Sequence, residues 1–139
     1  MFLLDINVWI ALALDLHPHH MAANSWYEAS SDPCCFCRLT QQGFLRLASN
    51  PAALKDQAVT LQKAWHLYDD MMSDPRVVFV EEPEGIEDQW RVFTQRRTFS
   101  PKVWNDAYLA AFAKCADMEL VSFDKAITQF KGIKATILA

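Results

Sequence analysis

The sequence predicts an α/β protein, a three-layer α/β/α sandwich built around a central, mainly parallel sheet. Short apolar runs of strand length alternate along the chain with longer segments of helical periodicity, and this alternation is typical of βαβ units. The chain has 139 residues, of which 52% are hydrophobic and 22% charged. That length and balance fit one globular domain, so we expect residues 1–139 to form a single domain.

The first half of the chain contains two expected strands and three expected helices. The opening apolar run ends abruptly at Asp5, and Pro18 suits the first position of a helix. Thr40 can cap a helix that Asn50 and Pro51 end. In chain order we expect a strand over 2–4, helices over 8–14 and 18–29, a strand over 34–39 and a helix from 40 to 50.

The second half continues the alternation. Leu61, Trp65 and Tyr68 recur at helical spacing, and Pro75 ends that helix. The all-apolar run 77–80 is typical of a strand buried on both faces of a parallel sheet. In chain order we expect a helix over 54–72, a strand over 77–80, helices over 86–96 and 106–116, a strand over 119–123, a short helix over 125–130 and a last strand over 135–138.

Composition excludes several classes of protein. No apolar run reaches the ~18–20 residues needed to span a bilayer, and the first residues lack the basic start of a signal peptide. We therefore expect a cytoplasmic protein with no membrane contact. A net charge of −4, from 13 basic and 17 acidic residues, argues against nonspecific binding of polyanions through bulk charge.

One stretch nevertheless has the composition of a nucleic-acid contact. Between residues 89 and 105 there are basic residues and no acidic ones, and aromatic residues interleave with them. The alternative is an ordinary solvated face. The candidate RNA-binding residues are Arg91, Arg96, Arg97, Lys102 and Trp104.

The cysteines and histidines point to no metal site of their own. Cys34 is expected on one face of its strand and Cys35 and Cys37 on the other, and the C-x₂-C spacing of zinc sites is absent. We expect small buried thiols in a reducing compartment. The cluster His17, His19 and His20 is more typical of a helix surface than of a transition-metal site, because no carboxylate stands at helical spacing with it.

Three acidic residues occupy equivalent places in the predicted fold. Asp5 and Asp124 each follow an apolar strand, and Asp106 begins a helix that precedes the strand ending at Asp124. Parallel strands present their carboxyl ends at one edge, where such sheets bind ligands, so we expect the three carboxylates to converge there. The alternative for Asp106 is a favourable place near a helix N-terminus, and for Asp124 a helix cap.

Convergent carboxylates repel one another unless a cation compensates them. The runs that carry these acids contain no Lys or Arg: Phe2-Leu3-Leu4-Asp5, Asn105-Asp106-Ala107-Tyr108 and Leu120-Val121-Ser122-Phe123-Asp124. A hard divalent ion held by carboxylate oxygens and water, Mg²⁺ or Mn²⁺, is the economical solution. Such an ion can activate water and stabilise a phosphoryl transition state.

Four motifs in this order resemble the PIN-domain ribonucleases, and among them the VapC-type toxins of bacterial toxin–antitoxin systems. The motifs are Leu4-Asp5-Ile6-Asn7-Val8-Trp9-Ile10, Thr40-Gln41-Gln42-Gly43-Phe44-Leu45-Arg46, Asp106-Ala107-Tyr108-Leu109-Ala110-Ala111 and Ser122-Phe123-Asp124. The resemblance covers essentially the whole chain. It implies a Mg²⁺-dependent endoribonuclease that forms a homodimer and is covered at its acidic groove by a small antitoxin protein.

The resemblance also implies roles for individual residues. Asp5 and Asp106 would be catalytic metal ligands, Asp124 a further member of the acidic site, and Asn7 a support for Asp5. The family usually has a Glu near the start of the helix at Thr40, where this chain has Gln41 and Gln42. Either Gln is a candidate weak ligand or supporting residue, and the exchange puts metal affinity and turnover in question.

Two other functions stay open at this point. One is a phosphotransfer or phosphatase-like domain with Asp5 as the phosphate acceptor, although its expected second Asp is replaced by Asn7. The other is a PIN-fold binding module with weakened catalysis, which the missing Glu permits.

Overall fold

The computed structural model describes residues 1–139 and contains a five-stranded parallel sheet with strand order β3-β2-β1-β4-β5. All four neighbouring pairs run parallel. The strands are β1 (Phe2–Leu4), β2 (Cys34–Phe36), β3 (Val77–Phe79), β4 (Glu119–Ser122) and β5 (Lys134–Ile137).

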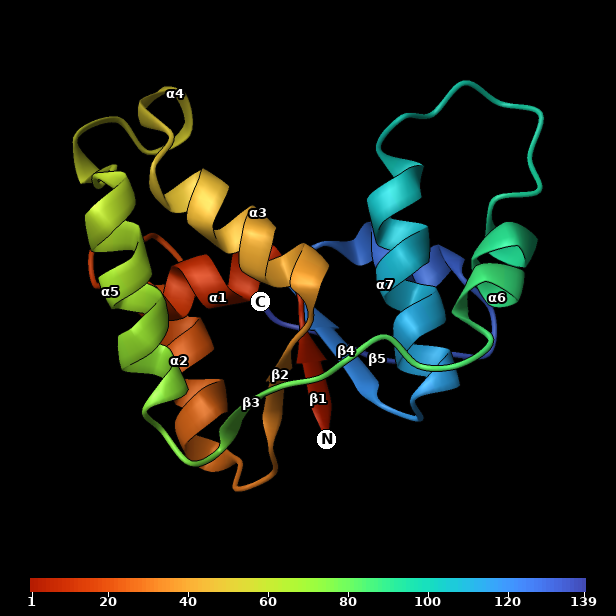
Figure 1. Cartoon of the computed structure of the whole chain (residues 1–139), viewed down its shortest axis with the longest axis horizontal. Coiled ribbons are helices and arrows are strands. Elements are labelled where there is room, and N and C mark those ends of the chain that lie inside the picture. Colours follow the sequence, from red (N-terminus) through yellow and green to blue (C-terminus); the bar gives the residue numbers. More distant parts are fainter.

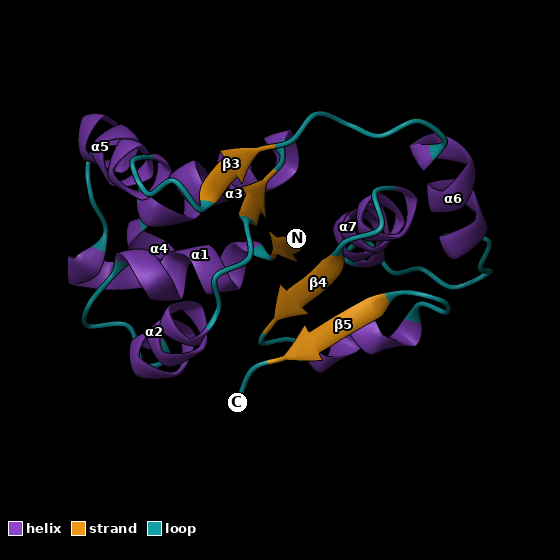
Figure 2. Ribbon diagram, turned by 90° about the horizontal axis from the view of Figure 1, so that it is seen from below, coloured by secondary structure: helices purple, strands orange, loops and turns teal.

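Helices cover both faces of this sheet (Figures 1 and 2). One side carries α1 (Ile6–Ala13), α2 (His20–Ala29), α3 (Arg38–Ala48), α4 (Pro51–Leu54), η1 (Lys55–Gln57) and α5 (Leu61–Met72). The other side carries α6 (Ile86–Phe93), α7 (Val103–Cys115) and the 3₁₀ helix η2 (Lys125–Gln129). The predicted three-layer α/β/α sandwich is confirmed.

The strands separate two hydrophobic cores because alternate side chains point to opposite faces. Leu3 and Leu120 pack into the core beneath α6 and α7, whereas Leu4 and Val121 pack into the core beneath α1, α3 and α5. All four side chains are fully buried. The central strands β1 and β4 are thus fixed on both faces, and their carboxyl ends form a rigid edge.

The cysteines follow the same alternation. Cys34 lies in one core, and Cys35 and Cys37 lie in the other, as predicted. All four cysteines are free, and burial raises the pKa values of Cys34, to about 12, and of Cys35, to about 11. None of the helices is long and apolar enough to cross a bilayer.

Several element boundaries differ from the sequence prediction. The strand expected over 34–39 ends at Phe36, because Cys37 already serves as the N-cap of α3 and its N–H donates to the Thr40 hydroxyl at 2.9 Å. Thr40 is therefore the third residue of the helix and not its cap. Pro51 begins the short α4 instead of only ending a helix, with Asn50 as its N-cap.

The long helix expected over 54–72 is also interrupted. Lys55 has a positive φ of 54°, which a continuous helix does not permit, and α5 starts only after Thr60, whose hydroxyl accepts the Lys63 N–H at 3.2 Å. The strand expected over 77–80 ends at Phe79, lies at the edge of the sheet and is not buried on both faces: Val77 is buried, but Val78 and Phe79 are partly exposed.

Candidate active site

The carboxyl ends of β1 and β4 lie side by side and bring two of the predicted acids together. Leu4 pairs with Val121, and the Asp5 N–H donates to the Val121 carbonyl at 2.9 Å. Asp124 follows two residues after the end of β4. The edge expected to hold the acids is therefore formed by two central, adjacent strands.

Asp5 is 9% exposed and is held at both carboxylate oxygens. Oδ1 accepts the Ile6 N–H at 2.7 Å, so Asp5 is the N-cap of α1, and Oδ2 accepts the Ser122 hydroxyl at 2.7 Å. Burial raises the pKa of Asp5, an effect that the hydrogen bonds from Ser122 and Ile6 oppose and the charge of Asp124 strengthens.

Ser122 connects the residues of this edge, a role that the sequence analysis missed. Its hydroxyl donates to Asp5 and accepts both the Asn7 side-chain amide at 3.2 Å and the Asp124 N–H at 2.9 Å. Asn7 also accepts the Phe123 N–H at 3.2 Å, so it ties α1 to the end of β4 and supports Asp5 through Ser122. The sequence feature that could have indicated this role is the position of Ser122: it is the last residue of its strand and lies two positions before Asp124.

Asp106 approaches the same edge from α7. It lies in the first turn of that helix, which runs antiparallel to β4 (Figure 1) and so begins beside the carboxyl ends of the strands. The pKa of Asp106 is raised to about 6, mainly by burial and in the same direction by the charges of Asp5 and Asp124. No hydrogen bond stabilises its charged form.

Asp124 is exposed and has a structural task as well as a place in this cluster. Its Oδ1 accepts the Ala126 N–H at 2.9 Å, which makes it the N-cap of η2. The helix cap considered for Asp124 from the sequence is therefore confirmed, and its charge also acts on Asp5 and Asp106.

The donor set suits a hydrated hard cation better than a tight metal cage. No three His, Cys, Asp or Glu side chains are grouped closely enough to enclose an ion. The charge of Asp124 still raises the pKa of Asp5, and the charges of Asp5 and Asp124 raise the pKa of Asp106, which means that a cation near these carboxylates would be stabilised. Mg²⁺ keeps several of its waters and binds through one or two carboxylates, so the arrangement fits it.

Gln41 and Gln42, the two candidates for the position where the family has a Glu, differ in their surroundings. Gln41 is 8% exposed, and its Oε1 accepts a hydrogen bond from Arg38 Nη1 at 2.5 Å, within the first turn of α3. Gln42 is exposed. The carbonyl of Gln41 is thus engaged by an arginine and not by the carboxylate cluster.

The predicted RNA-binding residues border the start of α7. Arg91 lies on α6 and pairs with Glu87 at 3.0 Å. Arg96 and Arg97 lie in the segment joining α6 to α7, at the end of the molecule where α7 begins (Figure 1). Lys102 is the N-cap of α7. The Trp104 side chain is 56% exposed, and its ring packs edge-on against the Trp90 ring with 5.9 Å between the centroids.

Arg96 is the one member of this set that reaches the η2 side of the site. Its Nη1 donates to Gln129 at 2.6 Å, and its guanidinium lies 5.5 Å from the Phe130 ring centroid.

One histidine lies closer to the carboxylate edge than the sequence indicated. The His19 ring stacks on Phe123 at 4.6 Å between centroids, and Phe123 separates Ser122 from Asp124. The His17 ring accepts the His19 N–H at 3.1 Å. Burial lowers the pKa of His17, with the charges of His19 and His20 as smaller causes.

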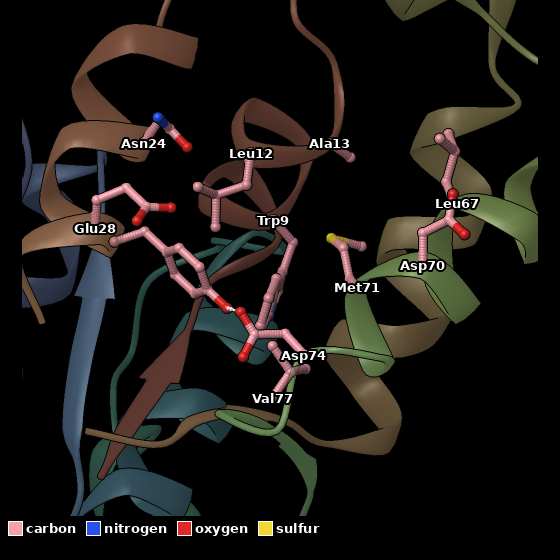
Figure 3. Close-up of a pocket in the computed structure, with 11 residues that line it drawn as sticks. Trp9, Leu12, Ala13, Asn24, Glu28, Leu67, Asp70, Met71, Asp74 and Val77 are labelled. Carbon is pink, nitrogen blue, oxygen red and sulfur yellow. Dashed lines mark hydrogen bonds between the residues drawn. The ribbon is translucent and has the colours of Figure 1, made fainter. Parts of the chain in front are cut away.

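A cavity of about 300 Å³ lies apart from these residues, between α1, α2 and α5 (Figure 3). Trp9, Leu12 and Met71 supply apolar walls, and Tyr27 donates to Asp74 across it at 2.6 Å. None of the three clustered carboxylates lines it.

The fold and the carboxylate edge together define the class of the protein. The PIN domain family matches residues 2–133, and the chain belongs to this family. Among characterised relatives, it is 45% identical to Ribonuclease VapC41 of Mycobacterium tuberculosis over 145 aligned positions, which cover 100% of this chain and 99% of the relative. It is 33% identical to Ribonuclease VapC44 of the same organism, over 90% of this chain and 87% of the relative.

Two solved structures of the same fold illustrate the similarity. VapBC2 from Rickettsia felis, bound to a DNA fragment from its promoter, matches with a TM-score of 0.71 at 12% identity and covers 99% of this chain and 98% of its own. DNA-bound VapBC from Salmonella typhimurium matches with a TM-score of 0.69 at 15% identity and covers 98% and 96%.

Proposed function

We propose that this chain is a Mg²⁺- or Mn²⁺-dependent endoribonuclease and the toxin of a toxin–antitoxin pair. Asp5, Asp106 and Asp124 are its catalytic and metal-holding residues. The observation that carries the proposal is Asp106: it makes no hydrogen bond that stabilises its charge, and burial together with the charges of Asp5 and Asp124 raises its pKa to about 6. The full-length similarity to Ribonuclease VapC41 supports the choice of RNA as substrate.

The protein's own residues prepare this edge for a cation and a phosphodiester. The Ile6 N–H and the Ser122 hydroxyl fix both oxygens of Asp5. A bound Mg²⁺ would supply Lewis acidity, which activates water for attack and offsets the charge that develops on the phosphodiester. Asp106, Asp124 and Asp5 provide the negative charge that would hold it, because a cation relieves their mutual repulsion while all three stay ionised.

RNA would approach over the segment that joins α6 to α7. Arg96, Arg97 and Lys102 offer cations for the backbone, and the exposed Trp104 ring offers a surface on which a base can stack. Arg91 is a weaker contact because Glu87 already shares its charge.

A small antitoxin and a second copy of the chain are the proposed protein partners. Solved structures of the same fold include toxin–antitoxin complexes. The carboxylate edge is a suitable target for a cationic side chain of such a partner, since a positive charge relieves the same repulsion as a metal ion. The homodimer rests on the family resemblance.

Cleavage of a labelled single-stranded RNA by the purified chain tests the proposed function. We expect cleavage with Mg²⁺ or Mn²⁺, none with EDTA, and a loss of at least 100-fold in rate for Asp106→Asn. Asp56→Asn is the matched control, because Asp56 is an exposed carboxylate on η1. Full activity of Asp106→Asn would remove this residue from the site, and binding of metal and RNA without cleavage would make the chain a binding module.

A further inference from the structure

Arg38 occupies the same edge of the sheet as the carboxylates, one strand away. Leu3 pairs with Cys35, so Cys37 is level with Asp5 in the parallel sheet. Arg38 then begins α3 in the way that Ile6 begins α1. Adjacent strands are about 4.8 Å apart, which makes Arg38 a neighbour of the acidic site on the side opposite to α7.

The guanidinium of Arg38 is held in a defined orientation. Nη1 donates to the buried Gln41 carbonyl at 2.5 Å, and the Cζ atom lies 4.7 Å from the Phe79 ring centroid. A planar group fixed by a hydrogen bond and an aromatic face loses less side-chain entropy when it binds a ligand. Its remaining N–H donors are free.

No acidic side chain neutralises Arg38. The ion pairs of the chain use Arg76 and Arg91, with Asp74 and Glu87 as their partners, together with a His and a Lys. Arg38 is exposed and takes part in none of them. It is therefore an oriented cation with its full charge available beside the proposed cleavage site.

The side-chain amide of Gln41 orients Arg38 by a hydrogen bond without neutralising its charge. Burial raises the pKa of Tyr68, and a hydrogen bond from Gln41 and the charge of Arg38 oppose this shift. Gln41 can accept from Arg38 and donate to Tyr68 at the same time, because a side-chain amide carries both functions. A Glu at this position would lack the donor and would cancel the charge of Arg38.

We infer that Arg38, positioned by Gln41, binds an RNA backbone phosphate next to the cleaved one, on the β2 side of the carboxylates. The guanidinium matches a phosphate in charge and in bidentate geometry. The RNA would then be held on both flanks, by Arg38 on one side and by the segment around Lys102 on the other. This inference rests on the proposed function, since it assigns a subsite for the same substrate.

Salt-dependent RNA binding tests the inference without the complication of cleavage. The Asp106→Asn protein serves as parent, and its affinity for a fluorescent single-stranded RNA is measured between 50 and 300 mM salt, a range of about sixfold. A lost phosphate contact lowers the slope of log affinity against log salt by about 0.7 for single strands. We expect this reduction for Arg38→Ala and for Gln41→Glu, whereas Arg38→Lys should keep the slope and bind more weakly.

Lys63→Ala is the control for a general loss of positive charge, because Lys63 is an exposed cation on α5. An equal slope change in Lys63→Ala, or an unchanged slope in Arg38→Ala, would overturn the inference. So would a Gln41→Glu variant that binds Mn²⁺ more tightly at an unchanged RNA slope, because Gln41 would then face the metal. If the unmodified chain neither binds nor cleaves RNA, the proposed function itself fails.

Discussion

At the scale of single residues, Asp106 differs from the other two carboxylates because it has no structural task. Asp5 caps α1 and Asp124 caps η2, so their removal would cost helix stability. Asp106 is half-buried, gains no hydrogen bond and is repelled by both neighbours. A cation bound beside these carboxylates would offset this repulsion.

We expect Asp106→Asn to remove most of the stabilisation that Mg²⁺ or Mn²⁺ confers. At a metal concentration 100-fold above Kd, a folded-state ligand adds about 2.7 kcal/mol to the free energy of unfolding, so the unmodified protein should show a clear rise in Tm. The metal-free variant should be at least as stable as its parent, because the substitution removes repulsion. Equal metal-induced shifts in variant and parent would contradict this assignment.

The same residue predicts a pH dependence of the metal-free protein. The folded pKa of Asp106, about 6, lies above the ordinary value of ~3.9, so the folded state binds the proton more tightly than the unfolded state. The contribution of Asp106 to stability is therefore fully present below pH ~3.9 and is lost as the pH rises through about 6. Denaturant unfolding at several pH values should show this loss in the parent and not in Asp106→Asn.

Ser122→Ala should weaken the site by removing hydrogen bonds that hold Asp5 and Asn7 in place. The substitution leaves a buried oxygen of Asp5 without its donor and leaves the Asn7 amide without its acceptor. We expect a loss of about 1–3 kcal/mol in the free energy of unfolding and slower RNA cleavage. Ser73→Ala, at an exposed hydroxyl after α5, should change stability by less than ~0.5 kcal/mol; matching losses in both variants would argue against a special role for Ser122.

The residues that the sequence identified and those that it missed differ in a physical way. Asp5 and Asp124 are recognisable because each follows an apolar strand, a local feature of the chain. Ser122 contacts Asp5 across a sequence separation of 117 residues, and the contact depends on which strands are neighbours. His19 likewise reaches Phe123 through the packing of α2, which no local pattern encodes.

At the scale of elements, the segment between α6 and α7 carries the proposed RNA contacts. Arg97→Ala should weaken RNA binding about equally across sequences and lower the salt slope by about 0.7. Arg91→Ala should have a smaller effect because Glu87 pairs with Arg91. Fluorescence measurements of RNA affinity at several salt concentrations check both predictions. If both variants show the same slope of log affinity against log salt as the parent, the segment is an ordinary solvated face.

Element boundaries show where local sequence signals stop being sufficient. The order of the five strands and the main helices was predicted because apolar periodicity is local, but the short α4 and η1 were not. The break at Lys55 depends on a backbone with φ of 54°, a conformation that nothing in the side chain announces. The partial exposure of β3 depends on its position at the edge of the sheet, which is set by strand order and not by the composition of the strand.

At the scale of the whole molecule, the strand order determines the chemistry. Because β1 and β4 are adjacent and parallel, the chain's first and penultimate strands bring Asp5 and Asp124 to one edge, and α7 adds Asp106 from the layer beside it. Arg38 begins α3 in the helical layer on one side of the sheet, and the α6–α7 segment belongs to the layer on the other side. We propose that this arrangement cleaves RNA with the aid of a metal ion.

The chemical nature of the RNA ends produced by the purified chain tests this central claim most directly. Attack by an activated water leaves a 5′-phosphate and a 3′-hydroxyl, whereas attack by the RNA's own 2′-hydroxyl leaves a 2′,3′-cyclic phosphate and requires a general base such as His19. We predict 5′-phosphate products that disappear with EDTA and return with Mg²⁺ or Mn²⁺. Cyclic phosphate ends, or cleavage that persists in EDTA, would contradict the account and favour His19, which stacks on Phe123, as the catalytic base.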